Sequence, residues 1–118
     1  MGSYVSGIYR GDANIWFSGN WAAGNAESRL TATSSSISIW ARVHEFRADT
    51  GTVISSTSWA CDYRSAANHP VSSPNVSQYS GCAVVSFPGG KVASMIAHHI
   101  FGGVTGTSTN EVFYGCLV

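Results

Sequence analysis

The stretch that decides the fold is SISIWARVHEFRADTGTVISSTSW, residues 36–59. Apolar and polar side chains alternate along its first half, and Asp49-Thr50-Gly51 is the clearest turn signal in the chain. A three-residue loop that ends in glycine commonly joins two antiparallel strands, because glycine adopts the positive φ that such a loop requires. The stretch therefore predicts a β-hairpin in which Phe46 lies opposite Ile54.

This register divides the hairpin into two faces, because successive side chains of a strand point to opposite sides of a sheet. Trp40 lies opposite Ala60 and shares the predicted outer face with Arg42, His44 and Phe46. The other face is the predicted core face, and it holds Ile37, Ile39, Ala41, Val43, Val53, Trp59, Cys61 and Tyr63.

The outer face of this hairpin is the predicted recognition surface. The chain has six basic and six acidic residues, and four of these charges fall between positions 42 and 49. Aromatic rings stack on sugar rings, and arginine donates paired hydrogen bonds to carboxylates or hydroxyls. The predicted ligand-binding residues are Trp40, Arg42, His44 and Phe46, with Tyr79 from a later segment. In the alternative interpretation, the charges only keep this face hydrated, and the two large rings cover loops or a second subunit.

Composition indicates a mainly β fold. Of the 118 residues only 10% are charged, and 13 are glycine. Strand-forming residues such as Val, Ile, Thr and the aromatics are plentiful, whereas Leu, Lys and Glu are scarce. Short strand-like runs separated by turn signals predict one domain, residues 1–118, folded as an antiparallel β-sandwich or a small β-barrel.

Two segments are less regular. Residues 91–101, KVASMIAHHIF, place Val92, Met95, Ile96 and His99 at helical spacing, which favours one short helix there. The same residues also fit a strand with Val92 and Ile96 on one face. Residues 64–80 contain two prolines and show no apolar period. Such long connections are usually functional or form compact loops.

The three cysteines predict one disulfide. Cys61 and Cys82 lie at the two ends of the long connection, where a bridge would contribute about 3 kcal/mol to stability. Pairing of Cys82 with Cys116 is the alternative, and three reduced thiols are a further one.

No residue pattern marks a catalytic centre, a metal site or a cofactor site. The four histidines lack the short spacings of zinc ligands, and the adjacent His98 and His99 point in different directions on either a helix or a strand. The chain also lacks a Gly-x-Ser-x-Gly nucleophile motif and a phosphate-binding loop. We therefore expect no cofactor and no metal, and favour a protein that is not an enzyme.

Charge and hydropathy limit the classes of partner that we expect the protein to bind. The net charge is zero and no basic patch is present, so nucleic acid is an unlikely partner on electrostatic grounds. No apolar run approaches the roughly 18 residues of a membrane span. Low charge with abundant Ser, Thr and Gly is typical of secreted, virion-surface or cell-surface proteins.

These observations favour an extracellular-type β binding module of the lectin kind. Four Trp and five Tyr residues in a chain rich in hydroxyls suit stacking and neutral hydrogen bonding to carbohydrate. The first alternative is a virion or assembly protein whose aromatics lie at contacts with other protein surfaces, including a homo-oligomer. The second is a small β-barrel enzyme or ligand carrier with aromatics around a cavity.

Overall fold

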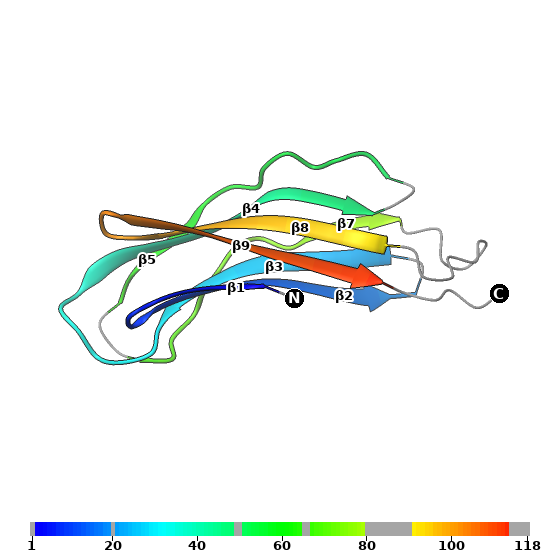
Figure 1. Ribbon diagram of the computed structural model, residues 1–118. Helices are drawn as coiled ribbons and strands as arrows, with labels where there is room; N and C mark the ends of the chain where they lie inside the picture. The colour runs from blue at the N-terminus through cyan, green and yellow to red at the C-terminus, as the bar shows by residue number, and fades with distance from the viewer. Residues whose placement is uncertain (1, 20, 49–50, 65–66, 80–90, 114–118) are drawn as a thin grey trace.

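The protein is a β-sandwich of two antiparallel sheets in the computed structural model (Figure 1). The structure describes residues 2–19, 21–48, 51–64, 67–79 and 91–113. These residues contain nine strands and no helix. The sandwich is one of the two architectures predicted from the sequence.

The first sheet, sheet A, has the strand order β1-β2-β3-β6, and β7 pairs with β3 beside β6. Every pairing in this sheet is antiparallel. Its strands are β1 (Ser3–Ser6), β2 (Tyr9–Ser18), β3 (Trp21–Leu30), β6 (Val71–Ser72) and β7 (Val76–Tyr79).

The second sheet, sheet B, has the order β5-β4-β8-β9, again antiparallel throughout. Its strands are β4 (Ile37–Ala48), β5 (Ala60–Arg64), β8 (Lys91–Phe101) and β9 (Val104–Phe113). Figure 1 shows β4, β8 and β9 lying over β1, β2 and β3 as a separate layer.

Three tight turns join consecutive strands of the two sheets. Gly7, Gly19 and Gly102 follow β1, β2 and β8, with φ of 58°, 59° and 58°. Only glycine adopts such angles without steric cost, which is why each hairpin turns at this residue.

Small residues on β3 set the distance between the sheets. The inner face of this strand includes Ala22, Gly24, Ala26 and Ser28, and all four are buried. A Cβ atom on Gly24 would overlap the side chain of Met95 from the opposite sheet. The absence of a side chain there lets the sheets pack closely. Ala, Gly, Asn and Glu are poor strand formers, so residues 22–28 show no strand signal of their own.

The core consists of two apolar clusters. The larger one lies around Phe46 and Met95 and contains mostly alanines from both sheets. The smaller one contains Leu30, Ile39 and Phe101, with the Tyr9 ring stacked on Phe101 at 4.8 Å between centroids.

The helix predicted for residues 91–101 is wrong, because this segment is strand β8. It lies between β4 and β9, so both of its edges are hydrogen-bonded. Met95, Ala97, His99 and Phe101 alternate inward and are at most 2% exposed. Hydrogen bonding along both edges of this central strand outweighs the helical spacing of its apolar residues. The β-branched side chains of the segment also favour a strand over a helix.

The hairpin from residue 36 to 59 is partly as predicted. Phe46 and Ile54 exchange backbone hydrogen bonds of 3.0 and 2.9 Å, as the turn implies. Farther from the turn the register slips by one residue, so that Trp40 pairs with Cys61 instead of Ala60. A one-residue slip moves every later side chain to the other face. Trp59, Cys61 and Tyr63, which were predicted for the core face, therefore lie on the outer face of sheet B.

A β-bulge on β4 explains why Phe46 is not on the outer face. The pairing with β8 shifts between Val43 and Glu45, so that both Val43 and Phe46 point inward. Phe46 is fully buried, whereas Glu45 and Arg47 are exposed. The predicted outer-face position of Phe46 is wrong, because an irregular residue breaks the two-residue period.

The long connection is partly ordered as strands. Within residues 64–80, β6 and β7 pair with β3, and Val71, Ser73, Val76 and Gln78 are buried. The side-chain oxygen of Gln78 accepts a 2.7 Å hydrogen bond from the backbone N–H of Ala48, which ties sheet A to the end of β4.

Candidate functional site

The outer face of sheet B carries a group of stacked side chains, here called the histidine–arginine cluster: Arg42, His44, Trp59 and His98. Arg42 and His98 are cross-strand partners on β4 and β8. The guanidinium carbon of Arg42 lies 4.4 Å from the centre of the Trp59 ring. The His44 and His98 rings stack at 4.1 Å between centroids, with 14° between their planes. The cluster is therefore a row of flat groups held against one another.

Hydrogen bonding fixes the tautomer of His98. A guanidinium can only donate, so Nη2 of Arg42 donates to Nδ1 of His98 at 3.3 Å, and the ring proton lies on Nε2. Burial lowers the pKa of His98, and electrostatic interactions with His44 and Arg42 lower it further. The ring is neutral at pH 7, and the cluster carries positive potential.

The structure brings together three of the five predicted ligand-binding residues. Trp40, Arg42 and His44 share the outer face of β4, and Trp40 contacts Trp59 edge to face at 6.0 Å. All three are half-buried. Phe46 lies in the core, as described above, and Tyr79 lies on the other sheet.

Tyr79 belongs to a second surface, here called the aromatic face: Trp16, Trp21 and Tyr79 on the outer side of sheet A. These side chains come from β2, β3 and β7, which lie side by side. They are 40%, 50% and 40% exposed. The rings of Trp21 and Tyr79 meet edge to face at 6.0 Å between centroids.

Neutral polar groups adjoin the aromatic face. Asn14 and Asn25 are cross-strand partners one outward row away from Trp16, and their side-chain amides share a 3.1 Å hydrogen bond. Ser77 on β7 lies opposite Ala23, in the same row as Trp16. The two amides thus lie about 7 Å along the strands from the row of Trp16, and about 13 Å from the row of Trp21 and Tyr79.

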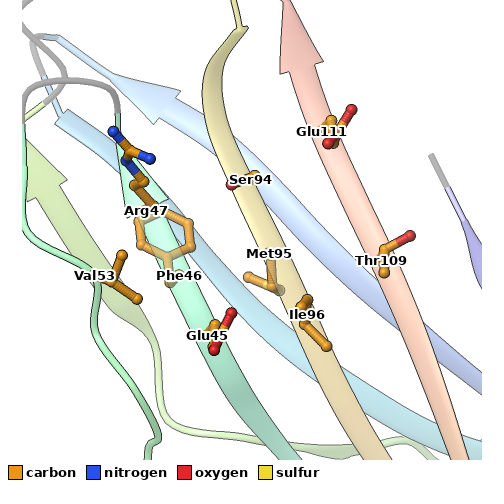
Figure 2. Close-up of a pocket in the computed structure, with 9 residues that line it drawn as sticks. All are labelled: Glu45, Phe46, Arg47, Val53, Ser94, Met95, Ile96, Thr109 and Glu111. Atoms are coloured by element: carbon orange, nitrogen blue, oxygen red, sulfur yellow. The ribbon is translucent and has the colours of Figure 1, made fainter.

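An open groove of about 380 Å³ lies farther along the outer face of sheet B. Figure 2 shows residues from three adjacent strands: Glu45 on β4, Ser94 and Ile96 on β8, and Thr109 on β9. The remaining lining residues are Phe46, Arg47, Val53, Met95 and Glu111. Neither His98 nor His99 lines this groove.

A buried polar row separates the two apolar clusters. Ser28 donates to the backbone oxygen of Trp40 at 2.8 Å, so its own oxygen accepts the Nδ1 proton of His99 at 2.8 Å. Nε2 of His99 then accepts from the Ser108 hydroxyl at 2.6 Å. Burial lowers the pKa of His99 to about 4, although the charge of Asp12 acts in the opposite direction.

This row resembles a serine–base pair in its geometry but is closed to substrate. His99 is 0% exposed and Ser108 is 3% exposed. A Cβ atom on Gly11 would overlap the His99 ring, so Gly11 covers the imidazole from sheet A. The row is consequently a satisfied polar layer of the core.

No family model, curated protein or solved structure matches the chain. The described residues include no group of three or more His, Cys, Asp or Glu side chains placed to hold a metal ion. They also form no helix long and apolar enough to cross a membrane.

The predicted disulfide cannot be placed. Cys61 is exposed on β5 and has no disulfide partner among the described residues. Cys82 and Cys116 lie outside the described residues, so the bridge between Cys61 and Cys82 stays a prediction.

Sequence reasoning missed Trp16, Trp21, Trp59 and His98 as site residues. Trp16 lies in the strand-like run of residues 13–17, and Trp21 follows the turn signal at residues 18–20. The two-residue period of a strand places Trp16 on the same side of β2 as Arg10, Asp12 and Asn14, which is its polar side. For His98 no local signal was available, because its partner Arg42 is 56 residues away.

Proposed function

We propose that the protein is an extracellular-type glycan-binding module that binds neutral sugar rings on its aromatic face. The observation that carries this proposal is the exposure of Trp16, Trp21 and Tyr79 on three adjacent strands. An aromatic side chain offers roughly 150–250 Å² of surface, and leaving three of them hydrated gives up the free energy of burying them. Such a patch on a monomer usually has a partner.

The chemistry of the patch favours carbohydrate as that partner. Flat aromatic faces stack on the apolar faces of sugar rings, and side-chain amides exchange hydrogen bonds with ring hydroxyls. The three rings lie in two cross-strand rows of outward side chains. The other members of these rows are Ser18, Ala23 and Ser77, and none is charged. A neutral ligand rich in hydroxyls fits these groups better than a charged surface does. The low overall charge is consistent with a secreted or surface-exposed protein.

The test first screens the wild-type protein on a glycan array. Calorimetry then compares the affinities of the wild type and of single alanine variants for the neutral oligosaccharide that binds most tightly. Trp21→Ala should weaken binding about tenfold or more, since one stacked ring contributes on the order of 1 kcal/mol beyond its buried area. Tyr63→Ala is the matched control, because Tyr63 is the most exposed aromatic of the described residues, at 68%, and lies on the other sheet.

Two outcomes contradict the proposal. One is equal binding by the wild-type protein and Trp21→Ala, with both folded. The other is the absence of any bound glycan together with a dimer that Trp21→Ala dissociates in sedimentation. The second result would assign the aromatic face to subunit assembly.

A further inference from the structure

We propose that the histidine–arginine cluster is a binding site for an oxyanion, such as a sulfate or carboxylate group. The site lies on the outer face of sheet B, whereas the aromatic face lies on sheet A, so it does not depend on the proposed glycan site. Arg42 is its centre, and His44 and His98 lie beside it.

Among the residues that the structure describes, Arg42 is held in place without a negatively charged partner. Its contacts among the described residues are the Trp59 ring at 4.4 Å and a nitrogen of His98 at 3.3 Å. The second distance exceeds the 2.9–3.0 Å typical of a strong N–H hydrogen bond. A guanidinium stacked on an indole ring has a fixed plane, and a fixed plane favours paired hydrogen bonds to an oxyanion.

The cluster has more hydrogen-bond donors than acceptors. A guanidinium carries five N–H groups, and the bond to His98 uses one of them. Nε of Arg42 is a donor buried without a hydrogen-bond partner, as are Nε of Arg10 and Arg29 on sheet A. Nδ1 of His44 is also buried without a partner, and its role as donor or acceptor depends on the tautomer. Such unsatisfied buried groups are uncommon in folded proteins. The N–H groups on Nη1 and Nη2 are the ones that a ligand on the half-buried outer face would reach.

The permanent positive charge at the site, that of Arg42, favours an anion, whereas the carboxylate of Glu45, directly after His44 on β4, opposes one. Arg42 and His44 face it from β4, and His98 faces it from β8. On the far side of His98, β9 contributes the uncharged Thr107. Trp59, just before β5, lies on this face. The outward side chains of β5 itself are the thiol of Cys61, opposite Trp40, and the phenol of Tyr63. Glu45 is the next charged residue along β4, and it lines the groove.

Proton binding and anion binding should be coupled at this site. Burial, and then electrostatic interactions with His44 and with the charge of Arg42, lower the pKa of His98. An oxyanion would offset the charge of Arg42 and raise that pKa, so the anion should bind more tightly as pH falls below 7. A change of one pKa unit corresponds to a tenfold change in affinity.

The experiment measures the histidine ring signals by NMR between pH 5 and 8, in sodium sulfate and in sodium chloride of equal ionic strength. For the wild-type protein, sulfate should raise the pKa of His98 and bind about tenfold more tightly at the acidic end than at pH 8. Arg42→Gln should abolish both effects. Arg47→Gln is the matched control, because it removes an exposed arginine of the same strand outside the cluster.

Repeating the titration with acetate and with a sulfated disaccharide separates a free anion from an acidic glycan as the ligand. Equal His98 titration in sulfate and chloride would overturn the proposal, and this measurement needs only the wild-type protein. An undiminished sulfate effect in folded Arg42→Gln would also overturn it. Loss of neutral glycan binding in Trp21→Ala tests the aromatic face alone, so the two proposals can fail separately.

Discussion

Protonation of His99 should make the fold sensitive to mild acid. In the folded protein the pKa of His99 is lowered to about 4 by burial, compared with 6.5 for an exposed histidine. As pH falls below 6.5, the unfolded chain takes up a proton that the folded protein does not accept until about pH 4. Folding stability is therefore greatest above pH 6.5 and falls as pH decreases through this window. Linkage gives a loss of about 2 kcal/mol between pH 7 and 5, and about 3 kcal/mol by pH 4.

The assay is urea unfolding, followed by tryptophan fluorescence, at several pH values between 7 and 4.5. A loss of about 2 kcal/mol should lower the urea midpoint by about 1 M for a domain of this size. His99→Gln keeps a polar side chain but does not titrate, so the difference between the two proteins isolates His99 from His98 and the carboxylates. Equal losses in the two proteins would refute the reasoning. If the variant does not fold, a His99 ring signal that titrates above pH 6 in the wild type refutes it instead.

Three further predictions concern packing and the thiols. Gly11→Ala should destabilise the protein by several kcal/mol in urea unfolding, because the added methyl group overlaps the buried imidazole, whereas Gly103→Ala, with open space around it, should change stability by less than about 0.5 kcal/mol. Phe46→Ala should cost about 3–5 kcal/mol in the same assay and leave glycan affinity unchanged in the folded fraction. Peptide mapping without reductant should recover Cys61 joined to Cys82, and an alkylated Cys61 peptide from oxidised protein would contradict the bridge.

Alternation and turn chemistry predicted the β fold, because these signals are local. On β4 the inward residues Ile39, Ala41 and Val43 were identified, since each lies two positions from the next. The prediction failed at Phe46, where the bulge adds a residue to the period. A bulge depends on the pairing of two distant strands, so nothing in the immediate sequence marks it.

The site was predictable only in part, for a similar reason. Trp40, Arg42 and His44 follow one another on a single strand, and the two-residue period places them together. His98 and Trp59 join them through strand pairing and through a one-residue slip. Tyr79 was assigned to the same surface because sequence proximity does not tell which of two sheets a later strand joins. Here β7 pairs with β3 of sheet A.

The buried row of Ser28, His99 and Ser108 has a consequence for how uniquely the strands can align. Moving a strand by two residues keeps the same side chains facing inward, and inner faces made largely of alanine distinguish poorly between such alignments. A two-residue shift of β9 that places Gly106 where Ser108 now lies would remove the hydroxyl that meets the imidazole. A shift of β3 would place Ala26 or Leu30 where Ser28 lies. Either shift leaves a buried nitrogen unsatisfied at a cost of about 1–3 kcal/mol. The polar row therefore selects one alignment among several that apolar packing alone would tolerate.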